Sequence, residues 1–98
     1  MEKFSEIINS DTPTLVDFFA EWCAPCKAMK PILEEVKQKM GNKVRIIKID
    51  VDKNNNLAQK LDIRSIPTLV LYRKSNIVWR ASGVRTANEL ISIIEKNL

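Results

Sequence analysis

The sequence contains no histidine. This absence excludes histidine-based acid–base catalysis, Ser–His and Cys–His nucleophile pairs, and imidazole ligands for a metal ion. Cysteine is also scarce, with two residues, whereas a small scaffold held by disulfides usually carries about four or more. Two cysteines in a small domain therefore indicate chemistry at a cysteine pair more than a structural framework.

Aromatic residues make up only 6% of the chain, and the net charge of +4 comes from scattered basic residues. A platform for single-stranded nucleic acid needs aromatic side chains on which bases stack, and a basic arm shows a run of like charges. The sequence has neither feature. We therefore expect a solvated surface with a mild basic bias and no nucleic-acid partner.

Long apolar runs are absent as well. No stretch approaches the roughly 20 consecutive apolar residues that cross a bilayer, so we expect no membrane partner. The first residues contain no apolar segment of the kind found in signal peptides, which predicts a cytoplasmic location. The 98 residues have room for one hydrophobic core, and we expect a single domain over residues 1–98 that acts as a monomer.

The spacing of apolar residues predicts helices that alternate with strands. Two strands joined by a helical crossover must run parallel, whereas the last two strands are too close in sequence for a crossover and must form an antiparallel hairpin. The expected fold is α/β, with a mixed central sheet of four to five strands flanked by helices on both faces. The predicted helices cover residues 2–9, 24–40, 54–61 and 86–98, and the predicted strands cover residues 14–20, 44–51, 67–72 and 77–81.

The last predicted helix has a clear start signal. Thr86 and Glu89 have the spacing of a capping box, in which each side chain accepts a hydrogen bond from the main-chain N–H of the other residue. The predicted core face of this helix consists of Leu90, Ile91, Ile94 and Leu98.

The two cysteines, Cys23 and Cys26, lie where a buried strand is followed by a helix. Residues three apart on one helical turn can close a disulfide after a small adjustment, so the pair can cycle between dithiol and disulfide. Cys23 lies at the helix N-terminus, where unpaired N–H groups and the helix dipole favour an anion, and we expect its thiol pKa to be lowered. Cys23 is predicted to attack a disulfide, and Cys26, lying further in and less exposed, to resolve the mixed disulfide.

A zinc site is the usual alternative for a Cys-x-x-Cys sequence. Zinc takes more ligands than two thiolates, and the chain offers no imidazole, so we expect no metal site. A zinc ion or iron–sulfur cluster shared between two chains is a remote alternative. A purely structural disulfide would close a very small loop and add little stability. Redox chemistry is the favoured interpretation.

The sequence around the cysteine pair resembles the thioredoxin family, and the resemblance covers nearly the whole chain. A lone Cys-x-x-Cys is a weak signal, whereas the full set of segments at the spacing of the family is highly specific. The family usually has Gly-Pro between the cysteines, where this chain has Ala24-Pro25, and this difference bears on redox poise and partner fit. The matching segments are residues 16–27 (VDFFAEWCAPCK), 30–33 (KPIL), 48–52 (KIDVD) and 63–68 (IRSIPT), together with Gly83.

The resemblance implies roles for two charged residues. Asp17 matches the buried acid that the family places beneath the disulfide, with a pKa raised by burial, and this acid exchanges a proton with Cys26. Lys48 matches the lysine that tunes this acid. From the residues alone, Asp17 is also explained by pairing with a lysine or a main-chain amide, and Lys48 by an exposed position on a strand.

The resemblance also implies a substrate-binding surface. Ile66-Pro67 matches the cis-proline loop that faces the disulfide, and the Ile66 backbone would pair with an extended substrate segment, as in strand addition. Trp22, Ala24-Pro25, Pro67 and Gly83 would form the shallow apolar surface around it. A buried, purely structural Trp22 is the alternative.

The implied function is that of a thiol–disulfide oxidoreductase that reduces protein disulfides through a Cys23–Cys26 cycle. No bound cofactor is implied, and the electrons would come from NADPH indirectly, through a thioredoxin reductase. Two alternatives stay open. One is a disulfide oxidase or isomerase in an oxidising compartment, and the other is a thioredoxin-fold module that holds a partner.

Two departures from the family pattern bear on the fold. The turn near Ser75 lacks the glycine that is common there, so we expect a strained or reshaped hairpin. The sequence before the first predicted helix is too short for the opening strand of the family. We therefore expect four well-formed strands.

Overall fold

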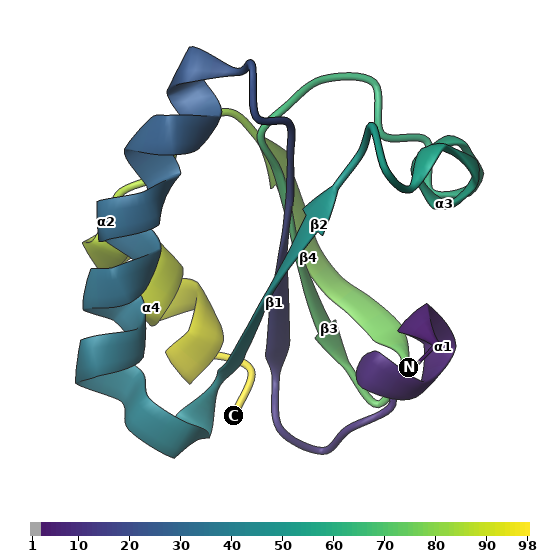
Figure 1. Cartoon of the computed structure of the whole chain (residues 1–98). Helices are drawn as coiled ribbons and strands as arrows, with labels where there is room; N and C mark the ends of the chain where they lie inside the picture. The colour runs from purple at the N-terminus through teal and green to yellow at the C-terminus, as the bar shows by residue number, and fades with distance from the viewer. Residues whose placement is uncertain (1–2) are drawn as a thin grey trace.

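The computed structural model describes residues 3–98 and contains a four-stranded sheet with helices on both faces (Figure 1). The predicted order of helices and strands is confirmed, with bounds that shift by a few residues, and residue 2 of the first predicted helix lies outside the described residues. The elements are α1 (Phe4–Ile7), β1 (Thr14–Phe19), α2 (Ala24–Met40), the 3-10 turn η1 (Gly41–Lys43), β2 (Arg45–Asp50), α3 (Asn55–Lys60), β3 (Thr68–Arg73), β4 (Asn76–Ser82) and α4 (Ala87–Glu95).

The sheet is mixed, with the strand order β2-β1-β3-β4. β1 and β2, which α2 connects, run parallel, and Asp17 lies opposite Lys48 in their register. β3 runs antiparallel to β1, and β3 and β4 form the predicted antiparallel hairpin. Four strands are present in residues 3–98, as expected, and β2 and β4 form the two edges of the sheet.

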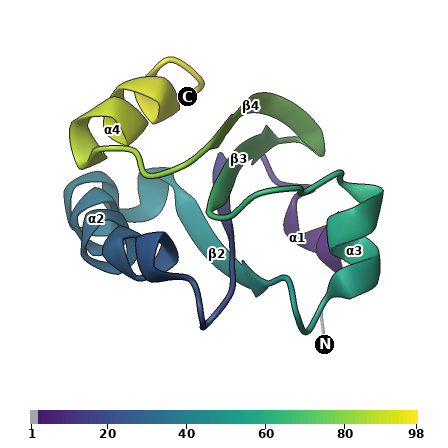
Figure 2. The ribbon, with the colours of Figure 1, turned by 90° about the horizontal axis from the view of Figure 1, so that it is seen from above.

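The helices form a layer on each face of the sheet, with α2 and α4 on one face and α1 and α3 on the other (Figure 2). The central strands β1 and β3 are almost completely buried because both of their faces are covered. This burial explains the near-continuous apolar run at residues 14–20. Within the described part of the chain, no helix is long and apolar enough to cross a membrane.

The chain leaves the carboxyl end of β1 and enters α2 within a few residues. Cys23 is the N-cap of α2, with extended φ and ψ of −88° and 110°. Pro25 follows in the first turn, where its missing N–H removes no hydrogen bond of the helix. The helix is held on the sheet by a stripe of buried residues: Met29, Leu33, Val36 and Met40.

The predicted capping box of α4 is only half formed. Thr86 Oγ1 accepts a hydrogen bond from the Glu89 N–H at 3.1 Å. The Glu89 carboxylate pairs instead with the Arg85 guanidinium at 3.2 Å, so it contributes to the helix start through an ion pair at the surface.

The end of α4 differs from the prediction. Leu90 and Ile94 are buried and Ile91 is half-buried, as expected, but Leu98 is 51% exposed. The prediction that Leu98 faces the core is therefore wrong. The helix ends at Glu95, and beyond this residue the helical spacing no longer says which way a side chain points.

The turn of the β3–β4 hairpin passes through Lys74 and Ser75, which have φ of +51° and +69°. This left-handed region favours glycine, so the strain expected from the missing glycine is present. Two main-chain hydrogen bonds hold the turn in place, from the Lys74 N–H to the Ser10 carbonyl at 2.8 Å and from the Ser75 N–H to the Ile8 carbonyl at 3.0 Å.

The substitution Ser75→Gly should stabilise the protein, because glycine removes the steric cost of the positive φ and keeps the main-chain hydrogen bond. We expect the free energy of unfolding in urea to rise by about 0.5–1 kcal/mol. Ser92→Gly is the matched control, since Ser92 lies exposed within α4. This control should lower the free energy of unfolding by about 0.5 kcal/mol. A loss of stability in Ser75→Gly would show that the turn is not strained.

Candidate active site

The two cysteines form a disulfide at the start of α2, with their Cα atoms 5.3 Å apart. The Cys26 N–H donates a hydrogen bond to Cys23 Sγ at 3.2 Å. In the reduced protein the same N–H, together with the positive end of the helix dipole, would stabilise a thiolate at Cys23. The predicted position of Cys23 at the helix N-terminus is thus confirmed.

The predicted difference in exposure between the cysteines is wrong. Cys23 is 4% exposed and Cys26 is 5% exposed. Both side chains pack in a small apolar cluster with Ala20, and Phe19 and Ile66 border this cluster. Depth in the molecule therefore does not distinguish the two sulfurs, and their different positions on the helix N-terminus must do so.

The loop before β3 lies against Cys23. The Ile66–Pro67 peptide bond is cis, as the resemblance implies, and the Ile66 carbonyl oxygen lies 3.8 Å from Cys23 Sγ. The Pro67 carbonyl accepts a hydrogen bond of 2.8 Å from the Gly83 N–H. Gly83 directly follows the end of β4 and has a φ of +90°. Residues with a side chain rarely adopt this φ, so glycine suits this position beside the loop.

Trp22 is exposed over 72% of its surface, and the alternative of a buried, structural tryptophan is wrong. Its indole Nε1–H donates a hydrogen bond to Asp52 Oδ2 at 2.8 Å. Asp52 is fixed in turn by the hydrogen bond from its own N–H to Asp50 Oδ1 at 2.9 Å. The sequence alone does not single out Asp52, because nothing in the local pattern links it to a tryptophan 30 residues earlier.

Asp17 lies within β1 and has no exposed surface. Neither carboxyl oxygen has a hydrogen-bond partner, so pairing with a lysine or a main-chain amide does not explain this residue. Burial raises the pKa of Asp17 to about 6, against a smaller lowering effect of the Lys48 charge. An acid of this kind can take up and release a proton near neutral pH.

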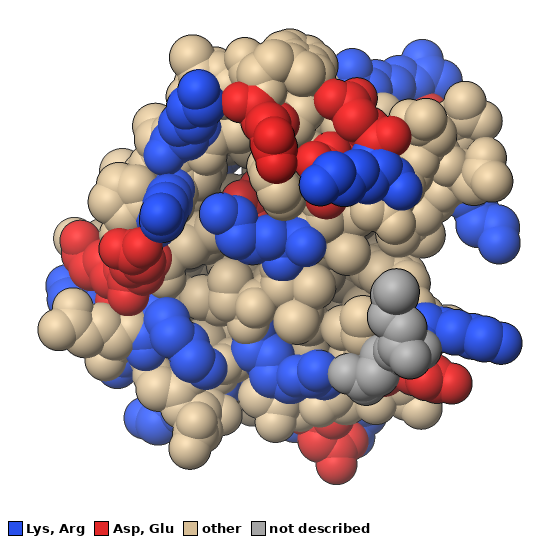
Figure 3. Space-filling model, viewed as in Figure 1, with Lys and Arg blue, Asp and Glu red and all other residues tan. Residues whose placement is uncertain are grey.

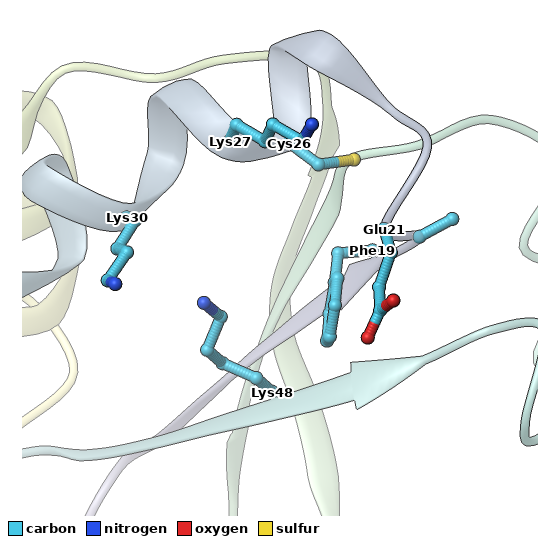
Figure 4. A pocket seen from close by; sticks show the side chains of 7 residues that line it. Phe19, Glu21, Cys26, Lys27, Lys30 and Lys48 are labelled. Carbon is cyan, nitrogen blue, oxygen red and sulfur yellow. The ribbon is translucent and has the colours of Figure 1, made fainter.

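Lys48 is exposed on β2, opposite Asp17 in the register. Its Nζ lies 5.3 Å from the centre of the Phe19 ring, and it forms no ion pair with Asp17 within residues 3–98. Lys48 and Cys26 line the same cavity of about 230 Å³ between α2 and β2 (Figure 4). The cavity therefore joins Cys26 to Lys48, the residue opposite Asp17 in the strand register.

Arg80, which no pattern in the sequence singles out, anchors the loop that leads to Ile66. Arg80 of β4 donates hydrogen bonds to the carbonyls of Leu61 and Asp62 at 2.6 and 2.7 Å. Asp62 has a positive φ of 56°, so this carbonyl lies at a sharp bend of the chain. The guanidinium thereby ties the start of the loop to the edge of the sheet.

The structure brings the predicted site residues into two groups. Cys23, Ile66, Pro67 and Gly83 are joined by the contacts described above, and Trp22 stands exposed beside them. Ala24 and Pro25 are exposed in the first turn of α2. Asp17 and Lys48 lie on adjacent strands beneath α2. In residues 3–98 no group of three or more Asp, Glu, His or Cys side chains could hold a metal ion.

Comparison with known proteins gives the same assignment. The family model named Thioredoxin matches residues 1–96. The chain belongs to the thioredoxin family. It is 39% identical over 93 residues to a thioredoxin of Rickettsia felis, covering 95% of this chain and 89% of the relative. It is 41% identical over 97 residues to the chloroplastic thioredoxin Y of Oryza sativa subsp. japonica, covering 98% of this chain but 58% of that longer relative.

Solved structures of thioredoxins share the fold. The oxidized mitochondrial thioredoxin 3 of Saccharomyces cerevisiae superposes with a TM-score of 0.84 at 30% identity, over 95% of this chain and 86% of that chain. A chloroplastic thioredoxin z superposes with a TM-score of 0.82 at 37% identity, over 89% of this chain and 79% of that chain. Family membership and the Cys23–Cys26 disulfide together make the chain a thiol–disulfide oxidoreductase.

Asp17→Asn should change how stability depends on pH. The pKa of Asp17 rises from 3.8 to about 6 on folding, so the protonated carboxyl stabilises the fold below pH 3.8, and this contribution is lost as pH rises through about 6. The neutral amide does not titrate. The variant's gain in unfolding free energy over wild type should therefore grow by about 3 kcal/mol between pH 3.5 and pH 8.

Urea denaturation of the oxidised proteins at the two pH values measures this difference. Asp11→Asn is the control, because Asp11 is exposed and forms only a long ion pair of 3.9 Å. Its difference from wild type should be small at both pH values. An Asp17→Asn difference that does not change with pH would contradict the burial of an unpaired carboxyl.

Proposed function

We propose that this protein reduces disulfides in other proteins, using Cys23 as the nucleophile and Cys26 as the resolving thiol. The observation that carries this proposal is the hydrogen bond of 3.2 Å from the Cys26 N–H to Cys23 Sγ at the start of α2. This N–H favours negative charge on Cys23 rather than on Cys26, so the two sulfurs have different roles although they are equally buried.

In the first step the Cys23 thiolate attacks one sulfur of the substrate disulfide. A bond forms between Cys23 Sγ and that sulfur, the substrate S–S bond breaks, and the other substrate sulfur leaves as a thiolate. The Ile66 carbonyl lies 3.8 Å from Cys23 Sγ, so a substrate segment that pairs with the main chain of the cis-proline loop is brought close to Cys23.

In the second step Cys26 attacks Cys23 Sγ. The mixed disulfide breaks, the second substrate sulfur leaves as a thiolate, and the Cys23–Cys26 disulfide forms, so the substrate gains two electrons and the protein loses two. Cys26 must first lose its proton. Asp17, which is buried in β1 and has no hydrogen-bond partner for its carboxyl group, accepts this proton. Lys48 supports the ionised form of Asp17 through its charge.

The substrate lies on the surface formed by Trp22, Ala24-Pro25, Ile66-Pro67 and Gly83. Trp22 presents an exposed ring held by its hydrogen bond to Asp52, so it offers apolar area with little rotamer freedom left to lose. An extended substrate segment would pair with the main chain of Ile66 beside Cys23. This arrangement presents one substrate sulfur to Cys23.

The oxidised protein must receive two electrons before the next turnover. A thioredoxin reductase that draws on NADPH is the donor we propose, and the domain itself binds no cofactor. We place this activity in the cytoplasm, where thiols are kept reduced and a protein that reduces disulfides has a constant electron supply. We also propose that the protein acts as a monomer.

Substitution of each cysteine should separate the two steps. Cys23→Ser removes the nucleophile and should lower the reduction of insulin disulfides to the background rate. Cys26→Ser keeps the nucleophile but cannot resolve, so it should accumulate a covalent adduct with an insulin chain, which mass spectrometry without reductant detects. The adduct should disappear after addition of dithiothreitol.

The double variant Cys23→Ser, Cys26→Ser is the control and should form no adduct. If Cys23→Ser retains turnover, or if Cys23→Ser accumulates the adduct and Cys26→Ser does not, the assignment of roles is wrong. A double variant that keeps the biological role of the protein would favour the alternative of a binding module.

A further inference from the structure

A basic groove lies between α2 and the edge strand β2, on the side of the molecule shown in Figure 3. Two hollows of about 230 and 280 Å³ form this groove, and both are lined by Lys30 and Lys48. Figure 3 shows several Lys and Arg side chains beside this groove. Lys37 also lines it, but its ammonium donates to two main-chain carbonyls at 2.9 Å and is held at the end of α2.

Three lysines of the groove lack an acidic partner. Lys27, Lys30 and Lys48 line it, and in residues 3–98 none of them takes part in an ion pair. The side chains of Lys30 and Lys48 extend toward each other across the groove (Figure 4). Two glutamates, Glu21 and Glu34, also line the hollows, but neither forms an ion pair with these lysines. The groove is thus suited to an added anionic group.

The edge of β2 beside this groove has main-chain groups that point away from the sheet. The N–H groups of Arg45 and Val51 donate to carbonyls at the start and end of β1, at 2.9 and 2.8 Å. Peptide groups alternate in direction along a strand, so those of Ile46, Lys48 and Asp50 point outward. The Asp50 carbonyl already accepts a side-chain hydrogen bond of 2.9 Å. In the sheet formed by residues 3–98, Ile46 and Lys48 are left at the free edge of β2, where a further strand can pair.

The side chains of β2 determine which residue types an added strand needs on each of its two faces. Ile46 and Lys48 line the groove on the α2 side, whereas Ile47 and Ile49 pack on the opposite face with the α1 and α3 layer. Residues of an added strand alternate in the same way and lie beside these side chains. Acidic residues would therefore face α2, and apolar residues would lie between them on the other face.

We propose that the free edge of β2 binds an extended acidic segment of a partner protein, in which Asp or Glu alternates with apolar residues. The segment adds a strand to β2 through the main chain of Ile46 and Lys48, and its carboxylates meet Lys27, Lys30 and Lys48. This site adjoins the cysteine pair, because Cys26 lines the hollow of about 230 Å³. A partner held here has its disulfide at a high effective concentration near the cysteine pair.

Binding of a peptide without cysteine tests this site apart from disulfide reduction. The probe is a fluorescein-labelled hexapeptide of alternating glutamate and valine with blocked ends. The control peptide has three glutamates followed by three valines, with the same charge and composition. Fluorescence anisotropy at low salt measures both affinities. We expect the alternating peptide to bind at least about fivefold more tightly, because only this peptide can place its carboxylates on one face of a strand.

Charge reversal locates the site. Lys30→Glu should weaken binding of the alternating peptide about tenfold, because it replaces an attraction by a repulsion inside the groove. Lys60→Glu is the matched control, since Lys60 is an exposed lysine on α3, which lies on the opposite face of the sheet. This control should change the affinity by less than about twofold. Circular dichroism confirms that both variants are folded.

Hydrogen exchange distinguishes strand addition from charge attraction alone. The amide protons of Ile46 and Lys48 should exchange fast in the free protein and become protected when the alternating peptide is bound. The Ile47 amide, which points toward β1, should not change. Equal binding of the two peptides, absence of new protection, equal weakening by Lys60→Glu, or displacement of the peptide by a single-stranded oligonucleotide of equal charge would each overturn the proposal.

Discussion

The redox site depends on one local constraint, the abrupt passage from the buried strand β1 into α2. This passage makes Cys23 the N-cap of the helix and directs the Cys26 N–H to its sulfur at 3.2 Å. β1 can hold this position because it lies in the interior of the sheet, with β2 on one side and β3 on the other. The strand β3 begins directly after Pro67, so the same sheet also places the cis-proline loop against Cys23.

Asp17 shows how this buried strand serves chemistry at a cost in stability. A carboxyl group without exposed surface and without a hydrogen-bond partner is unfavourable when ionised. The same burial raises its pKa to about 6, so the group can exchange protons in the range in which thiols react. Lys48 on the neighbouring strand offsets part of the cost while its ammonium stays exposed.

Much of this structure follows from the sequence, because the strands β1 and β3 are buried on both faces and mostly apolar. The cis bond before Pro67 and the burial of the acid Asp17 were predicted from the family resemblance and not from the residue pattern. Other features depend on contacts between distant segments, such as the bond of Trp22 to Asp52 across 30 residues. The outward position of Leu98 depends on where α4 ends, which apolar spacing does not determine.

The equilibrium reduction potential of the Cys23–Cys26 pair tests most directly whether the protein gives electrons to its partners or takes them. Incubation with glutathione buffers of known ratio, followed by thiol labelling, measures this potential. We predict a value more negative than the cytosolic glutathione pool, which lies at about −220 to −260 mV by extraction. A value clearly above −200 mV, near the poise of an oxidising compartment, would contradict a reductase and favour a disulfide oxidase or isomerase.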